Sequence, residues 1–309
     1  MHRGDEMLDG ILVVWKEAGM TSHDVVFKLR KILRMKKIGH TGTLDPEVEG
    51  VLVVCLGQAT KLVEFLMSGH KIYQGEVTLG WSTETEDHTG KLVERKPVLQ
   101  ALDESLVDSV MATFKGKITQ IPPYYSAVKV NGRKLYEYAR QGMKVERPQR
   151  QIEIYQLNRL SPIKYDADSQ SCSWKFDVEC SKGTFVRTLA VDIGRALGYP
   201  AHMSALERLA SSGYHDQQAL TLAEIEQVYQ EGRIEEYIQP IETALTEFPQ
   251  LTISEQAYEL VKHGSVLPAD YFGSLIDQPC CLIYQDRLVA MYYGHPQRPG
   301  WIKPRKMFR

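Results

Sequence analysis

The stretch GHTGTLDPEVEGVLVVCL, residues 39–56, combines a glycine-rich loop with an apolar run. Three glycines allow the backbone to turn tightly around Asp45, and the following Pro46 biases Asp45 towards an extended conformation. The continuous apolar run Val51–Leu56 is typical of a buried strand. The stretch therefore predicts a loop that presents one carboxylate rigidly, followed by a strand of the core.

The carboxylate of Asp45 has both a chemical and a structural interpretation. A free aspartate is ionised at neutral pH, so it can act as a nucleophile or a base without special tuning. Aspartate before proline is also common in ordinary turns. Spacing alone leaves these two interpretations open.

Local patterns elsewhere in the chain predict helices and strands in irregular alternation. Residues 22–33 indicate an amphipathic helix capped at Ser22, and residues 185–197 predict a helix that stops at Gly198. Residues 73–79 and 172–181 alternate apolar and polar side chains, as half-buried strands do. Because no regular β-α-β period is present, the pattern favours an α+β fold over a doubly wound sheet.

Charge is unevenly distributed along the chain, although the net charge is only -2. Residues 25–40 contain six basic residues and no acidic one, and residues 115–150 contain nine basic residues and two acidic ones. Seven glutamates and one arginine lie between residues 221 and 250. Separated basic stretches favour binding to a phosphate backbone, but each alone is equally typical of a solvated helix face.

Composition also argues against several classes of protein. The apolar runs are much shorter than the roughly 20 residues of a membrane-spanning helix, and the N-terminus lacks the pattern of an export signal, so we expect a cytoplasmic protein. The five cysteines form no CxxC pair, and no GxxxxGK motif is present. We expect neither a metal nor another cofactor.

The segment around Asp45 resembles the catalytic-aspartate motif of the TruB family of tRNA pseudouridine synthases. Similar blocks lie in family order at residues 19–26, 39–46, 57–62, 71–73, 79–90, 120–129 and 181–189. Residues 251–306 are more weakly similar to a PUA-type RNA-binding domain. The resemblance implies a pseudouridine-synthase catalytic domain over residues 1–248, with a mixed, mainly antiparallel sheet, and a small β-rich PUA-like domain over residues 249–309.

The implied reaction converts a uridine of the tRNA T arm, at position 55, to pseudouridine. The enzyme would flip the base out of its stack and attack with an aspartate carboxylate. As implied by the family, the partner is the T-arm stem-loop of tRNA. Neither a membrane nor an obligatory protein partner is expected, and the protein is expected to be a monomer.

The resemblance also assigns roles to individual residues. Asp45 would be the nucleophile or base, and Arg187 would pair with it, a task that suits a forked guanidinium. Tyr73 would stack on the flipped uracil, and Leu206 would line the uracil pocket. His40 would stack in the T loop where the target base leaves.

Three further residues are assigned on the same basis. Phe185 stands where the family usually has tyrosine, so its ring would pack in the site without a hydroxyl. Lys16 and Lys129 would bind RNA. The segment around Lys129, residues 122–134, would either contact RNA or brace the active-site strands. Glu207 stands where a basic residue is usual, so one local contact of the family differs here.

Two other classes of function compete with this interpretation. A non-catalytic chaperone that binds and folds tRNA would use the same basic stretches, but it would not need Asp45, Tyr73 and Arg187 together. A nucleoside or glycoside hydrolase would need a second acid to protonate the leaving group, and no motif identifies one.

Overall fold

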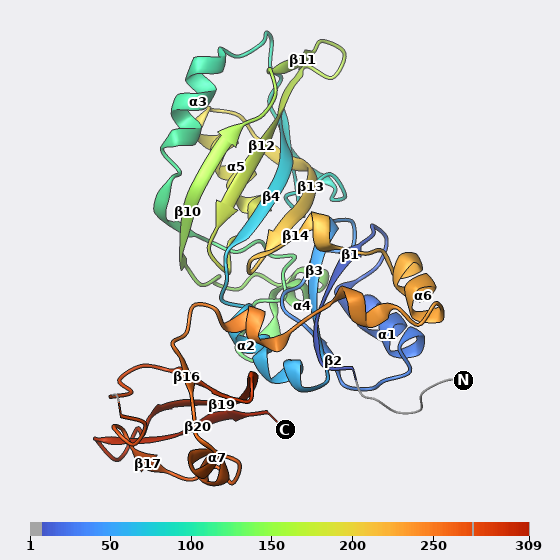
Figure 1. The fold of residues 1–309 in the computed structure, drawn as a ribbon. Coiled ribbons are helices and arrows are strands. Elements are labelled where there is room, and N and C mark those ends of the chain that lie inside the picture. The colour runs from blue at the N-terminus through green and yellow to red at the C-terminus, as the bar shows by residue number, and fades with distance from the viewer. Residues whose placement is uncertain (1–7, 274, 309) are drawn as a thin grey trace.

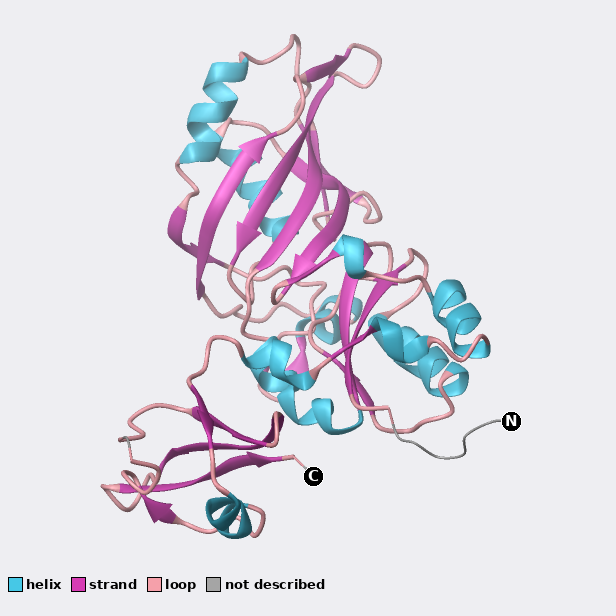
Figure 2. Ribbon diagram, in the orientation of Figure 1, coloured by secondary structure: helices cyan, strands magenta, loops and turns pink. Residues whose placement is uncertain are grey.

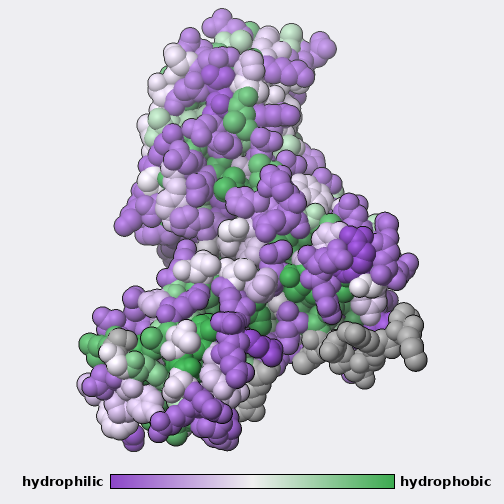
Figure 3. Space-filling model, viewed as in Figure 1, coloured by the Kyte–Doolittle hydropathy of each residue, from purple (hydrophilic) through white to green (hydrophobic). Residues whose placement is uncertain are grey.

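The computed structural model describes residues 8–273 and 275–308 and has an elongated shape (Figure 1). Of the N-terminal segment for which no export signal was predicted, residues 1–7 lie outside the described residues. Most of the strands before residue 240 form one long sheet, two pairs of short strands form sheets of their own, and a separate small sheet holds the C-terminal strands. In the space-filling view, polar side chains cover most of the visible face (Figure 3).

Eleven strands of the described chain form the large sheet, with the main order β15-β1-β3-β13-β4-β12-β10-β7. Within this sheet β13 pairs in parallel with β3, and the other strand pairs are antiparallel. The predicted α+β fold with a mixed, mainly antiparallel sheet is therefore confirmed. The bounds are β1 (Gly10–Lys16), β2 (Ile38–His40), β3 (Glu49–Leu56), β4 (Lys71–Leu79), β7 (Gly116–Gln120), β10 (Arg150–Arg159), β11 (Lys164–Asp166), β12 (Ser171–Cys180), β13 (Ala201–Ser211), β14 (Tyr214–His215) and β15 (Ile238–Gln239).

Helices pack on the faces of this sheet and close two separate parts of the core (Figure 2). Helix α5 buries one side against β4, β12 and β13, while α1 and α6 pack together on β1 and β3. The alternating strand predicted at 172–181 and the helix predicted at 185–197 are both present. The bounds are α1 (Ser22–Ile32), α2 (Val63–Leu66), α3 (Glu104–Ala112), α4 (Leu135–Arg140), α5 (Val186–Ala196) and α6 (Leu222–Gln230).

The cap of α1 differs from the prediction by one residue. Thr21, not Ser22, is the N-cap, and its side chain and that of Asp24 form a reciprocal capping box. The hydroxyl of Ser22 is buried and accepts a hydrogen bond from the Leu44 amide, 2.9 Å away. The N-terminus of α1 is thereby attached to the loop that contains Asp45.

The remaining elements are short and lie in connections or in the C-terminal part. The C-terminal sheet has the order β16-β18-β19-β20-β17, and Cys281, Leu288, Met291 and Phe308 pack into the same core cluster as β1 and β3. The C-terminal bounds are β16 (Gln250–Thr252), α7 (Glu255–Val261), β17 (Leu267–Pro268), β18 (Cys280–Tyr284), β19 (Arg287–Gly294) and β20 (Trp301–Met307). The others are β5 (Trp81–Thr83), β6 (Leu92–Arg95), β8 (Lys129–Val130), β9 (Arg133–Lys134) and the 3-10 helices η1 (Gly57–Leu62), η2 (Asp216–Gln218), η3 (Ile234–Tyr237) and η4 (Ile241–Leu245). None of the described helices is both long enough and apolar enough to cross a membrane.

Candidate active site

Asp45 lies in the loop between β2 and β3 of the large sheet. Two distant groups fasten the backbone of this loop. The amide of Gly19 donates to the Pro46 carbonyl, and the Arg208 guanidinium donates to the carbonyl of Gly42 and, on β3, to that of Val51. Because Arg208 is almost completely buried, this attachment is shielded from water.

Asp45 forms an ion pair with Arg187, the second residue of α5. The distance from Arg187 Nε to Asp45 Oδ2 is 3.0 Å. The two terminal nitrogens of Arg187 donate to the carbonyls of Thr85 and Tyr125 at 2.9 and 3.0 Å. Each of the three guanidinium nitrogens therefore has a partner, and these contacts fix the orientation of the guanidinium towards Asp45. The arginine side chain is only 6% exposed, whereas 45% of the Asp45 side chain is exposed, so the carboxylate is oriented but accessible.

A cavity of about 370 Å³ lies beside this ion pair and is of the size that small ligands occupy. Its lining includes five residues that the sequence assigned to the site: Asp45, Tyr73, Phe185, Arg187 and Leu206. They come from five different elements or connections, and β4 and β13, which carry Tyr73 and Leu206, are neighbours in the sheet. The tertiary structure thus brings most of the predicted site residues around one small space.

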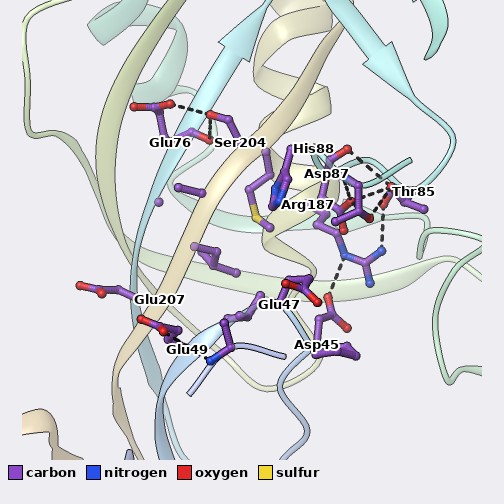
Figure 4. A pocket seen from close by; sticks show the side chains of 18 of the residues that line it. Asp45, Glu47, Glu49, Glu76, Thr85, Asp87, His88, Arg187, Ser204 and Glu207 are labelled. Atoms are coloured by element: carbon purple, nitrogen blue, oxygen red, sulfur yellow. Dashed lines mark hydrogen bonds and ion pairs between the residues drawn. The ribbon is translucent and has the colours of Figure 1, made fainter. Parts of the chain in front are cut away.

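A second cavity, of about 800 Å³, shares Asp45, Arg187 and Leu206 with the first one (Figure 4). It has many acidic side chains in its wall, including Glu47, Glu49, Glu76, Asp87 and Glu207. Glu49 and Glu207 are direct partners in the parallel pairing of β3 and β13. Glu207, which departs from the basic residue usual in the family, therefore adds negative charge at this wall.

Tyr73 is 8% exposed and contributes its ring to the smaller cavity. Burial raises the pKa of its hydroxyl above the ordinary value, so the group stays neutral at physiological pH. The guanidinium of Arg208 lies 6.0 Å from the centre of the ring. An aromatic wall next to an accessible carboxylate can hold a flat, uncharged ring such as a nucleobase.

His40 lies at the end of β2, and neither cavity has it in its lining. Burial, followed by the nearby charge of Arg208, lowers its pKa, so the imidazole is neutral at physiological pH. Its Nδ1 accepts a hydrogen bond from the Gly42 amide at 3.4 Å. The stacking role assigned to His40 remains a prediction about the RNA complex.

The RNA contact assigned to Lys16 is not supported by the structure. Lys16 has no exposed surface, and its ammonium donates to the carbonyls of Glu17, Met20 and Pro46 at 2.9, 2.7 and 2.9 Å. The side chain points inward because it lies at the end of β1, beside the loop of Asp45. Its charge therefore fastens that loop and does not reach a phosphate group on the surface.

Lys129, by contrast, is exposed on β8 within the segment that connects β7 to β10. It lines a third hollow together with Tyr124 and Arg147, whose guanidinium stacks 4.3 Å from the tyrosine ring. The same segment supplies the Tyr125 carbonyl that fixes Arg187. Its geometry therefore combines a brace for the active site with a cationic, aromatic surface.

Two supporting groups were not singled out from the sequence. One is Arg208, whose contacts with the loop are described above. The other is Asp87, which accepts hydrogen bonds from the Thr85 hydroxyl at 2.6 Å and the Thr89 amide at 2.9 Å. Although burial raises the pKa of Asp87, these hydrogen bonds lower it on balance. The pattern Thr85-Glu86-Asp87-His88-Thr89 was visible as part of a similar block, but its link to Arg187 depends on the fold.

Among the described residues, no group of three or more histidine, cysteine, aspartate or glutamate side chains is arranged to hold a metal ion. The five cysteines are buried free thiols.

Comparison with known proteins identifies the family. The model of the TruB family pseudouridylate synthase N-terminal domain matches residues 30–186, and that of the tRNA pseudouridylate synthase B C-terminal domain matches residues 187–246. The tRNA pseudouridine synthase B of Halalkalibacterium halodurans is 49% identical over 302 residues, which cover 97% of each chain. The protein of the same name from Bacillus subtilis is 48% identical over 304 residues, covering 97% of this chain and 98% of that one.

Solved structures show a similar fold. The matched chain of a Cbf5-Nop10-Gar1 complex has a TM-score of 0.73 and 29% identity, covering 97% of this chain and 84% of that one. The matched chain of an H/ACA RNP bound to a substrate RNA containing 2'-deoxyuridine has a TM-score of 0.71 and 26% identity, covering 97% of this chain and 85% of that one. The chain belongs to the TruB family of pseudouridylate synthases, and its activity is the formation of pseudouridine in tRNA.

Proposed function

We propose that the chain isomerises the uridine at position 55, in the T arm of tRNA, and that Asp45 is the catalytic carboxylate. The observation that carries this proposal is the Asp45–Arg187 ion pair, which stands beside a cavity walled by Tyr73. The carboxylate is exposed to a ligand, but its orientation is determined by a buried guanidinium. Both properties are required of a group that acts on a bound nucleotide.

The reaction exchanges one bond of uracil for another. The bond between N1 of uracil and C1′ of the ribose breaks, the base turns, and C5 forms the new bond to C1′. The proton on C5 leaves and N1 gains one, so no oxidant or reductant is consumed. The base must leave its stack to reach the site and must be retained while it is detached.

The side chains of the smaller cavity fit these requirements. Asp45 would attack the ribose or the uracil, or would act as a base, while Arg187 keeps the carboxylate in position. Tyr73, Phe185 and Leu206 would hold the detached ring by stacking and apolar contact. Because the Tyr73 hydroxyl is neutral, packing the base against it removes no charged group from water.

The test uses a T-arm stem-loop RNA and full-length tRNA, each tritiated at C5 of uridine. Release of tritium is measured for the wild type, for Asp45→Asn and for the control variant Asp168→Asn, which changes an exposed aspartate in the turn between β11 and β12. RNA binding of all three proteins is measured in parallel. We expect release by the wild type and the control, and binding without release by Asp45→Asn.

Two other results would contradict the proposal. Release by Asp45→Asn at the wild-type rate would remove the catalytic role of the carboxylate. Binding without release by the wild type on both RNAs would favour the non-catalytic tRNA chaperone. Sequencing of the tRNA product for the modified position separates the T arm from other sites.

We further propose that the protein works as a cytoplasmic monomer without an obligatory protein partner. The smaller cavity brings Asp45, Tyr73 and Arg187 of one chain together, and the five cysteines are buried free thiols. Light scattering of the active protein, alone and with tRNA, would test the monomer.

A further inference from the structure

Glu86 lies next to the carbonyl that orients Arg187, and its backbone is in an unusual conformation. The carbonyl of the preceding residue, Thr85, accepts the 2.9 Å hydrogen bond from Arg187. The φ angle of Glu86 is 66°, in the left-handed region that side chains longer than asparagine rarely adopt. Such a conformation persists only where the surroundings fix it.

The surroundings fix Glu86 from two sides. Its carboxylate accepts a hydrogen bond from the hydroxyl of Thr188, 2.8 Å away, and Thr188 directly follows Arg187 on α5. Its backbone carbonyl accepts a hydrogen bond from the Met203 amide at 3.0 Å, on the strand that carries Leu206. One residue therefore connects the turn at 85–87 to both the helix of Arg187 and the strand of Leu206.

The choice of glutamate at this position needs an explanation. A left-handed turn is most easily made with glycine, which has no side chain to strain. A carboxylate placed in a largely buried position also loses hydration, and this burial raises the pKa of Glu86 above its ordinary value. The contact with Thr188, with the charges of Arg187 and Arg147 nearby, offsets part of the cost of burial.

We propose that Glu86 is a positioning residue: by binding Thr188 it holds the Thr85 carbonyl against Arg187, and through Arg187 it sets the direction of the Asp45 carboxylate. The proposal rests on the catalytic role proposed for Asp45. It predicts that the Glu86–Thr188 hydrogen bond affects turnover and leaves the affinity for tRNA unchanged, because neither side chain lines the two cavities at Asp45.

The experiment compares four variants by turnover at saturating tRNA and by tRNA affinity. Glu86→Ala and Thr188→Val each remove the hydrogen bond, and both should lower turnover about tenfold. Glu86→Gln retains an acceptor oxygen for Thr188 and should keep turnover near that of the wild type. Glu86→Gly relaxes the left-handed backbone but lacks the contact, so its turnover should fall as far as that of Glu86→Ala.

A control is Thr243→Val, which also removes a threonine hydroxyl, at a site away from Asp45. Thr243 is exposed, and its hydroxyl lies 2.7 Å from the hydroxyl of the buried Tyr214 and donates to the Pro240 carbonyl at 2.6 Å. This variant should retain wild-type turnover once the folded fraction is matched. In addition, the double variant Glu86→Ala/Thr188→Val should lose no more turnover than either single variant, because both changes break the same bond.

Several results would overturn the inference. If Glu86→Gly matched the wild type while Glu86→Ala did not, the residue would matter only for the backbone conformation. Wild-type turnover in Thr188→Val would dismiss the bond even if Glu86→Ala failed to fold. An inactive wild type would instead overturn the proposed function itself, and the inference with it.

Discussion

Replacing Lys16 by methionine distinguishes two roles of its charge, RNA binding at the surface and attachment of the Asp45 loop in the interior, and the structure favours the second. The ammonium donates three hydrogen bonds of 2.7–2.9 Å to backbone carbonyls and has no exposed surface. Each bond from a charged donor contributes about 1.5–3 kcal/mol, but the buried ammonium loses its hydration, which opposes this gain. We expect a net loss of about 3 kcal/mol in the free energy of unfolding, and a melting temperature lower by about 5–10 °C.

The assay combines thermal unfolding with tRNA binding over a range of salt concentrations. Lys16→Met should keep the salt dependence of binding, because no phosphate contact is lost, while turnover falls as the loop of Asp45 loosens. The matched variant is Lys129→Met, at the exposed lysine that was also assigned to RNA binding. It should leave the melting temperature unchanged and lower the slope of log affinity against log salt by about 1. If Lys16→Met lowered that slope and kept the wild-type stability, the assignment of Lys16 to the interior would be refuted.

Three further predictions concern the same site. Arg187→Lys retains the charge but cannot contact Asp45, Thr85 and Tyr125 together, so turnover at saturating tRNA should fall about 100-fold. Single-turnover tritium release near the wild-type rate would contradict this prediction. Burial lowers the pKa of Lys71 to about 8, below its unfolded value of 10.5. Between these pH values the unfolded chain binds more protons than the folded chain, so the free energy of unfolding should rise with pH. Urea unfolding should show this rise in the wild type and in Lys117→Met, but not in Lys71→Met. A Cβ at Gly75 would lie 2.9 Å from the Phe176 ring and 3.0 Å from the Ala205 carbonyl. Gly75→Ala should therefore lower the free energy of unfolding by about 1–3 kcal/mol and lower turnover, because it displaces Leu206, the partner of Gly75 on β13. An unchanged free energy of unfolding would show that the two strands move apart without cost.

Local signals in the sequence were sufficient to predict many of the elements. The alternation at residues 172–181 and the stop at Gly198 each depend on neighbours within a few residues, and the structure has the strand and the helix end. Errors at this level were small, such as the cap of α1 at Thr21 in place of Ser22. A threonine and a serine in adjacent positions carry the same local signal, and only the contact of Ser22 with Leu44 distinguishes them.

The motif around Asp45, read with its family resemblance, also located the candidate carboxylate before any fold was known. By itself the motif could not say which basic side chains would surround it. The residues next to Lys16, Lys129 and Arg208 in the sequence do not distinguish these three cations. In the structure, Lys16 and Arg208 are buried and Lys129 is exposed.

Tertiary structure decided those differences because they depend on contacts between distant parts of the chain. The insertion of β13 between β3 and β4 buries Arg208 and brings Leu206 beside Tyr73, and the packing of α5 on that sheet carries Arg187 to Asp45. The sequence by itself determined the local elements and singled out Asp45 as the candidate carboxylate, since both depend on patterns of adjacent residues. The order of strands determined which charges lie inside, because a side chain's hydration depends on what packs over it and not on its neighbours in sequence.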